Sequence, residues 1–235
     1  MPYRRLPNTD AARIRSMEAA LSQAEKDEMD FKTVIPFDLQ YKLKNLYPEF
    51  TQAVDLYNQA YKRQVEAGKK LKKDFKMARL YLSHFLQVFN MAIIRNEINP
   101  REREFFELPP QDLSLPRLQT EKDLLHWGEI VISGEEKRLS RGHTPITNPK
   151  ITLVKLYYQR FKENYLFYKK LQEITAANLE NVSRLRPKVN KLIQKIWNSV
   201  EEYFADLPPR QKRENAARYG VVYFYRKEER ESQEN

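Results

Sequence analysis

A run of basic side chains between residues 62 and 79 has the clearest chemical potential in this sequence. The run holds eight Lys and Arg residues against two acids, Glu66 and Asp74. Cations that recur along a helix can neutralise phosphates, which gives nucleic-acid binding that depends on salt rather than on base sequence. The candidate nucleic-acid or anion contacts are Lys62, Arg63, Lys69, Lys70, Lys73 and Lys76.

The same run also fits the solvated face of a long helix, which keeps a basic protein soluble. No recognised nucleic-acid module accompanies the charges, and the Tyr and Phe residues fall on predicted core positions rather than between the cations. We therefore interpret the run first as solvated surface and keep nucleic-acid binding as the alternative. Membrane-surface binding is less favoured, because the opposite face is needed for the core.

Metal and catalytic sites lack their usual spacings in this chain. His84, His126 and His143 are more than 15 residues apart, whereas paired helical metal ligands follow His-Glu-x-x-His or repeated Glu-x-x-His patterns. There is no Gly-rich phosphate loop and no Gly-x-Ser-x-Gly. The absence of cysteine excludes disulfides and thiolate metal sites. We expect no enzyme activity, no cofactor, no metal and no small-molecule ligand.

Composition favours helix over sheet. Of the 235 residues, 31% are charged and only 5 are Gly, whereas sheet proteins need frequent tight turns. The formal net charge is +10, and the surplus falls on two predicted long helices. The opening MPYRRLPNTDAARIRSM lacks the apolar run of a secretory signal, and residues 80–94 are too polar to cross a bilayer. The sequence predicts a soluble, cytoplasmic protein.

Capping residues and apolar spacing predict the helices. A first helix should span 9–29, and residues 30–47, with Phe31, Val34, Ile35 and Phe37 among them, should form a packed connector. The first long helix should begin at Pro48 and end near Asn99-Pro100. A helix over 120–141, closed by Gly142, should precede a second long helix opening at Asn148-Pro149. The apolar stretch 221–225 indicates a short strand or packed tail, and the charged end a loose segment.

Both long helices carry an apolar seven-residue repeat, which lets two helices stay in contact along a shared supercoil. We interpret Gly68 as a small residue at a tight crossing and expect a kink at Pro187. If both helices break at these points, a compact four-helix bundle results. The repeat positions are Val54, Tyr61, Gly68, Phe75, Leu82 and Phe89 in the first helix, and Val154, Phe161, Tyr168, Thr175, Val182, Val189, Ile196 and Tyr203 in the second.

The two long helices also resemble each other. AVDLYNQAYK (53–62) and LVKLYYQRFK (153–162) share Val, Leu, Tyr, Gln and Lys at matching positions. This similarity indicates one short-helix/long-helix unit built twice, over 1–112 and 113–235, with the halves related by a pseudo-twofold axis within one bundle domain. Two amphipathic helices of similar composition can also align by chance.

Four segments carry a wider resemblance: YRRLPNTDAARIRSM, YLSHFLQVFNMAI, PITNP and RYGVVYFY. With these the chain resembles an uncharacterised family of all-helical bacterial hypothetical proteins of the Bacteroides type. The resemblance implies a helical bundle and no known activity. We therefore predict an all-α fold with two long antiparallel helices and shorter packed helices. The predicted function is a non-enzymatic scaffold or protein-interaction protein, with self-association or a protein partner.

Overall fold

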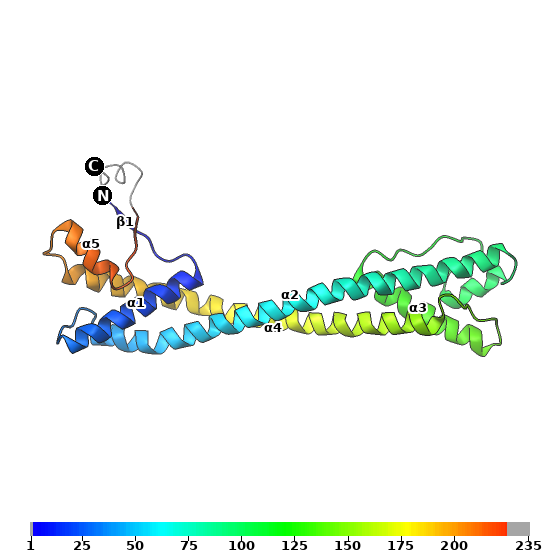
Figure 1. Ribbon diagram of the computed structural model, residues 1–235, viewed down its shortest axis with the longest axis horizontal. Helices are drawn as coiled ribbons and strands as arrows, with labels where there is room; N and C mark the ends of the chain where they lie inside the picture. Colours follow the sequence, from blue (N-terminus) through cyan, green and yellow to red (C-terminus); the bar gives the residue numbers. More distant parts are fainter. Residues whose placement is uncertain (1, 225–235) are drawn as a thin grey trace. The chain divides into compact units, whose positions relative to one another are not determined.

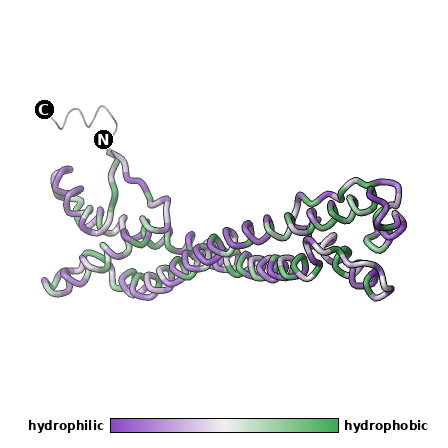
Figure 2. Tube along the Cα trace, turned by 45° about the vertical axis from the view of Figure 1, so that its right-hand side comes forward, coloured by the Kyte–Doolittle hydropathy of each residue, from purple (hydrophilic) through white to green (hydrophobic). Residues whose placement is uncertain are grey.

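The computed structural model describes residues 2–224, and most of these residues lie in helices (Figure 1). The all-α prediction is therefore confirmed. The elements are β1 (Tyr3–Arg4), α1 (Asp10–Met29), α2 (Phe37–Ile94), the 3-10 helix η1 (Pro100–Phe106), α3 (Glu121–Ser140), α4 (Ile151–Tyr203), α5 (Pro209–Ala217) and β2 (Tyr223–Phe224). Hydrophobic and hydrophilic residues alternate along α2 and α4 in Figure 2, as expected for helices with one buried face.

The chain divides into two compact units. Unit 1 combines residues up to 61 with residues from 174 onward, and unit 2 consists of residues 62–173. Each unit has its own hydrophobic core. The boundaries of these units differ from those of the proposed repeat over 1–112 and 113–235. The repeat stays a prediction about sequence duplication.

Unit 1 packs α1, the first part of α2, the last part of α4 and the C-terminal stretch around one core. α1 begins where the Thr9 side chain accepts a hydrogen bond from the backbone amide of Ala12, close to the predicted start. Met17 and Ala24 of α1 are buried, and the side chain of Trp197 on α4 is fully enclosed. These large apolar groups supply the packing that holds α1 against the longer helices.

Unit 2 is built on antiparallel segments of α2 and α4, with α3 and η1 packed beside them. The Phe75 and Phe161 rings lie 5.7 Å apart, and the Tyr81 and Tyr157 rings stack at 4.3 Å. Positions later in α2 thus meet positions earlier in α4, which gives the predicted antiparallel order. A Cβ added at Gly68 would lie 3.2 Å from the Tyr168 ring, so this glycine does permit a tight crossing.

α2 begins at Phe37, eleven residues before the predicted start at Pro48, so that prediction was wrong. The backbone amides of Leu39 and Gln40 donate to the Pro36 carbonyl, which starts the helix there. Leu39 is buried in the unit 1 core and stabilises this early turn. Pro48 is exposed, so its ring points away from the core and the helix loses only one backbone hydrogen bond.

α4 runs without interruption from Ile151 to Tyr203 with Pro187 inside it, and α2 passes through Gly68. The alternative of two broken helices was therefore wrong. α4 starts two residues after Pro149 rather than at Asn148-Pro149. Pro187 is exposed, so a single bond is lost on the solvent side of the helix.

Most predicted repeat positions are buried, but the pattern fails at two of them. Tyr61 is 52% exposed and Tyr203 is 51% exposed. In unit 1 the neighbouring Ala60 is buried instead. A straight α-helix drifts about 20° per seven residues away from a strict repeat, which turns such positions out of the core.

The connections follow the turn chemistry of the sequence. Thr120 and Asp123 form the predicted capping box of α3, and Gly142 adopts a positive φ of 84° just after this helix. β1 and β2 pair as a two-stranded antiparallel sheet, which confirms the short strand. Tyr225 and the charged end of the chain lie outside the described residues.

Candidate interaction surfaces

The first candidate surface is the basic face of α2 in unit 2. All six predicted contact residues are exposed. Lys62, Lys69 and Lys76 are seven residues apart, so they lie along one line of the helix at intervals of about 10.5 Å. Arg63 and Lys70 form a neighbouring line, again seven residues apart. The structure therefore brings the predicted residues together on one side of one helix.

The side chains of these cations are unpaired. None of the eight Lys and Arg side chains of the run forms an ion pair or hydrogen bond within residues 2–224. Asp74 cannot neutralise them, because it is buried and bonded to Arg160 at 3.0 Å and to Asn164 at 2.7 Å. Glu66 is the remaining acid of the run, and it is exposed. This basic face can neutralise an extended anion.

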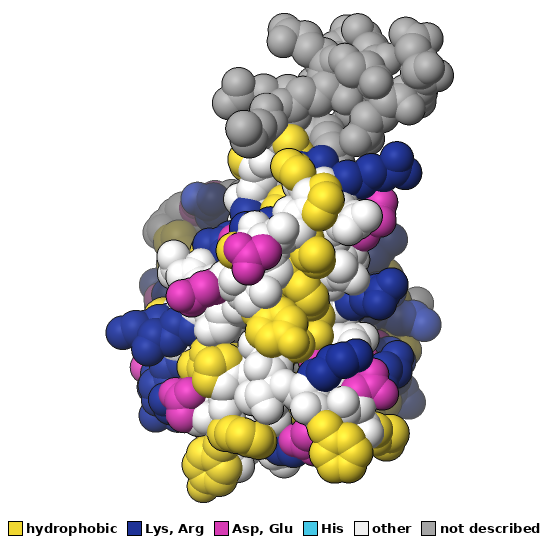
Figure 3. Space-filling view, turned by 90° about the vertical axis from the view of Figure 1, so that its left-hand side faces the viewer, with side chains coloured by type: hydrophobic (Ala, Val, Ile, Leu, Met, Phe, Trp, Pro, Cys, Tyr) yellow, Lys and Arg dark blue, Asp and Glu magenta, His cyan; other side chains and the backbone are white. Residues whose placement is uncertain are grey.

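The second candidate surface is an apolar corner of unit 1 where α1 ends and α2 begins. Four large apolar side chains there face solvent, with exposed fractions of 78% for Met29, 98% for Phe31, 69% for Phe37 and 71% for Tyr41. Figure 3 shows hydrophobic side chains gathered at the lower edge of the end face of unit 1. We call these four residues the α1–α2 corner. Clusters of exposed large apolar side chains mark interaction sites.

The sequence predicted a packed connector over residues 30–47, and most of its apolar side chains do pack. Phe31 and Phe37 are exposed. The side chains that pack as predicted are Val34, Ile35, Leu39, Leu43 and Leu46. Composition alone could not distinguish the buried from the exposed apolar side chains, because the direction of each side chain depends on the conformation of the turn. Phe31 and Phe37 were therefore not predicted as contact residues.

Phe31 also has an unusual backbone. Its φ is 56°, a left-handed conformation that ends the helix. The Lys32 amide donates to the Asp27 carbonyl at 2.8 Å, which completes the turn. Glycine is the usual residue at this position because an L side chain there costs about 1 kcal/mol. An exposed aromatic ring on a strained backbone contributes little to folding, which makes Phe31 a candidate contact residue.

The charges around the α1–α2 corner are paired with one another. Three lysine–carboxylate pairs surround it, and their N–O distances run from 3.0 to 3.5 Å. A hydrogen bond from Lys42 lowers the pKa of Asp38, so this carboxylate stays ionised at neutral pH. These three pairs therefore add no net charge to the apolar corner. The pairs are Lys32–Asp30, Lys42–Asp38 and Lys44–Glu28.

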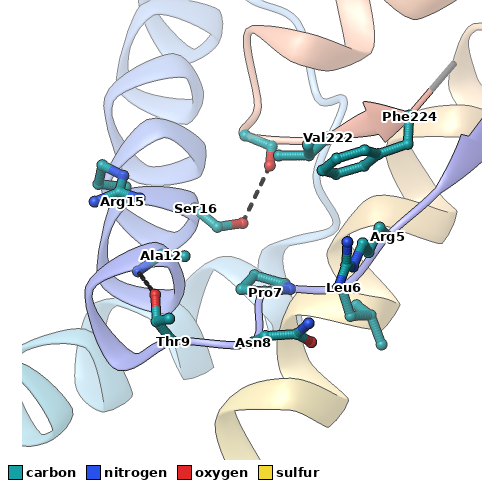
Figure 4. Close-up of a pocket in the computed structure, with 11 residues that line it drawn as sticks. Arg5, Leu6, Pro7, Asn8, Thr9, Ala12, Arg15, Ser16, Val222 and Phe224 are labelled. Carbon is teal, nitrogen blue, oxygen red and sulfur yellow. Dashed lines mark hydrogen bonds between the residues drawn. The ribbon is translucent and has the colours of Figure 1, made fainter.

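A third feature is a cavity of about 380 Å³ beside the start of α1. Figure 4 shows Leu6, Val222 and Phe224 around it. Two of the hydroxyls at this cavity take part in the fold. The Ser16 hydroxyl donates to the Gly220 carbonyl at 3.3 Å, and the Thr9 hydroxyl accepts from the Ala12 amide at 3.2 Å. These two bonds fix the start of α1 and the C-terminal stretch beside it.

The buried Tyr158 hydroxyl takes part in the unit 2 fold. Tyr158 is 5% exposed, and its hydroxyl lies 3.0 Å from both the Leu125 carbonyl and the Glu129 carboxylate. Burial raises the pKa of Tyr158. This confirms the interpretation of that tyrosine as a core residue with its hydroxyl at the rim.

His143 lies 3.2 Å from Glu102, while His84 and His126 are exposed. Among the residues that the structure describes, no group of three His, Cys, Asp or Glu side chains could hold a metal ion. No described helix is both long enough and apolar enough to span a membrane.

Comparison with known proteins gives no match: no family model, no curated protein and no solved structure is significantly similar to the chain. The resemblance to the helical bacterial family stays a prediction. The function must therefore be argued from the surfaces above.

Proposed function

We propose that this chain is a non-enzymatic helical scaffold that binds other proteins, and that its α1–α2 corner docks against a second copy of itself. The observation that carries this proposal is Phe31, which is 98% exposed on a strained backbone beside three further exposed apolar side chains. Apolar surface of this kind is unfavourable in water and is stabilised when a partner covers it.

Charge favours a second copy as the partner. The chain carries a formal net charge of +10, so most of its surface repels another copy. At the corner the three lysine–carboxylate pairs cancel, and two such corners can meet without like-charge contact. A twofold dimer brings the same patch together on both copies, which a neutral apolar patch allows.

The small size of the α1–α2 corner predicts how tightly two copies should associate. Stable interfaces bury on the order of 800 Å² per partner, with a few aromatic anchors at the centre. Four side chains are a small anchor set, so the dimer should be weak, with a Kd on the order of micromolar.

Sedimentation equilibrium over about a hundredfold range of protein concentration tests the proposal. The full chain should shift from monomer to dimer, and Phe31→Gly should remain monomeric. The same variant should fold more stably by about 1 kcal/mol, because glycine relieves the left-handed strain. Stability and association therefore move in opposite directions, so misfolding cannot explain the loss of the dimer.

Leu166→Ser is the matched control, because Leu166 is 60% exposed on α4 in unit 2 and lies outside the corner. It should leave the dimer unchanged. A chain that is monomeric at every concentration sinks the self-association. A dimer that survives Phe31→Gly combined with Phe37→Ser places the interface elsewhere and rejects the corner.

We keep nucleic-acid binding without sequence specificity as the second candidate, since the six cations on the basic face of α2 have no side-chain partner within residues 2–224. A DNA duplex titrated at two salt concentrations tests it. Lys62→Gln, Lys69→Gln and Lys76→Gln together should weaken binding and lower the salt slope by about 3, one for each lost phosphate contact.

The control removes three lysines that are already paired, Lys32, Lys44 and Lys155. Removal of these paired charges should change the slope less. Binding that is absent, insensitive to salt, or equally reduced in both triple variants rejects this second candidate.

A further inference from the structure

A second lysine cluster lies in unit 1, where α2 and α4 form a groove of about 420 Å³. Lys188, Lys191 and Lys195 project from α4 into its lining, and Lys42 contributes from α2. The three α4 lysines follow a spacing of three and four residues, so they share one face of the helix. Side chains from helices about 150 positions apart in the chain thus converge here.

The cations outnumber the acids at this groove. The side chains of Lys188, Lys191 and Lys195 form no ion pair or hydrogen bond within the part of the chain that the structure describes. Glu49 is the one acid in the lining. Asp38 lies outside the lining, where it pairs with Lys42 at 3.0 Å and attracts Lys195 electrostatically. Three neighbouring ammonium groups repel one another, and a multiply charged anion between them would relieve that repulsion.

The floor of the groove is apolar. Leu192 is 6% exposed and Leu46 is partly buried, and both belong to the unit 1 core or pack against it. Sites for small molecules combine such an apolar surface with a few charged groups that fix the orientation of the ligand. A purely ionic ligand would leave the exposed part of Leu46 uncovered.

We propose that this groove binds an amphiphile with a phosphate monoester head. The lysine ammonium groups would hold the doubly charged phosphate as point charges, and the alkyl chain would cover Leu46 and Leu192. This site is separate from the basic face of α2, and it borders the α1–α2 corner through Lys42, which pairs with Asp38. It adds a ligand class that the sequence did not indicate.

Isothermal titration calorimetry with dodecyl phosphate, below its micelle concentration, tests the site directly. We expect saturable binding of one ligand per chain, at least about tenfold weaker binding of inorganic phosphate, and no binding of the neutral dodecyl maltoside. Leu46→Ser should weaken the alkyl phosphate and leave inorganic phosphate unchanged. Vesicles containing phosphatidic acid then separate a bilayer head group from a free amphiphile as the source.

The decisive variant replaces Lys188, Lys191 and Lys195 by Gln and should lose roughly tenfold in affinity for dodecyl phosphate. Its matched control is the triple Gln variant at Lys62, Lys69 and Lys76, which removes the same charge from unit 2. The control should bind dodecyl phosphate like the unmodified chain. Equal losses in the two variants, full binding by the groove variant, or no saturable binding by the unmodified chain each overturn the proposal.

Discussion

Units 1 and 2 both close a helical core with a non-helical segment, but they hold that segment with different chemistry. In unit 2 the connection after α2 is held by arginine. The Arg103 side chain is 1% exposed and donates to the backbone carbonyls of Pro109 at 2.9 Å and Ser114 at 3.2 Å. In unit 1 the C-terminal stretch is held by tyrosine. The Tyr219 and Tyr223 hydroxyls each donate to a carboxylate at 2.6 Å.

A second arginine fixes the other end of the unit 2 connection. The side chain of Arg138 on α3 is fully buried, and its guanidinium donates to the Glu135 carboxylate at 2.7 and 2.9 Å. It also donates to Glu102 of η1 at 2.9 Å and to the Thr144 carbonyl at 2.6 Å. One guanidinium thus joins α3, η1 and the loop after α3.

Because the two segments are held by different chemistry, different changes should weaken them. A guanidinium stays charged in alkali, so a rise in pH leaves the arginine network of unit 2 intact, whereas removal of a partner breaks it. A tyrosine hydroxyl is a neutral donor that loses its proton in alkali. The arginine network of unit 2 should therefore be sensitive to mutation, and the tyrosine hydrogen bonds that hold the C-terminal stretch of unit 1 should be sensitive to alkali.

The largest expected effect is the loss of Arg138. Arg138→Met leaves the Glu135 carboxylate, 1% exposed, without its partner. We expect the free energy of unfolding of unit 2 to fall by about 3–5 kcal/mol, the cost of removing one partner of a buried ion pair. Urea unfolding monitored by circular dichroism measures this loss. Arg210→Met is the control, because Arg210 and Glu214 form an exposed pair worth at most about 0.5 kcal/mol. A loss below about 1 kcal/mol at Arg138 would contradict the comparison.

The next effect concerns how closely the C-terminal stretch of unit 1 approaches α1. Gly220 has a φ of 80°, and an added Cβ would lie 2.7 Å from the Ser16 carbonyl oxygen. Gly220→Ala combines backbone strain with a clash against backbone, so we expect a loss of about 2–4 kcal/mol. Gly142 has a φ of 84° with nothing within 4 Å, and Gly142→Ala should lose only about 1 kcal/mol of strain.

The difference between these two alanine variants isolates the approach of the tail to α1. Urea unfolding of both variants measures it, because the strain is common to them and cancels. Equal losses in the two variants would mean that the tail moves aside, and unit 1 would then be closed less tightly than unit 2.

The local features of this fold could be predicted from sequence. The capping box at Thr120, the turn at Gly142 and the crossing at Gly68 each depend on residues whose local chemistry or repeat phase gives a direct signal. The helix periodicity likewise gave the correct class. Such signals lie within a few neighbouring residues, and a sequence displays them directly.

Features that depend on distant partners could not be predicted. Phe31 and Val34 are both apolar and lie in the same connector, yet only Val34 is buried. Nothing local marks Arg138 as the centre of a buried network, since Glu102 is 36 residues away. The lysines around the unit 1 groove come from two helices, and only the packing of those helices brings them together.

The smallest expected effect is the response of unit 1 to alkali, and its sign follows from the tyrosines. Burial, reinforced by the hydrogen bond to a carboxylate, raises the pKa of Tyr219 and of Tyr223 above the usual value of about 10. The folded state therefore keeps protons that the unfolded state releases. The stability contributed by these hydroxyls is complete below about pH 10 and is lost as the pH rises beyond it.

Urea unfolding at about pH 8 and pH 11 measures this loss, which should be on the order of 1 kcal/mol for each tyrosine. Tyr219→Phe removes one of the two hydroxyls, so it should lower stability at pH 8 and flatten the alkaline decline. Tyr41→Phe is the control, because Tyr41 is 71% exposed. This substitution should change neither the stability at pH 8 nor the alkaline decline. An unchanged decline in Tyr219→Phe would mean that the Tyr219–Asp27 bond is not a pH-sensitive closure. The pKa of Tyr158 in unit 2 is also raised, so unit 2 should lose some stability of its own in alkali. A double variant of Tyr219 and Tyr223 should keep this alkaline loss of stability from unit 2.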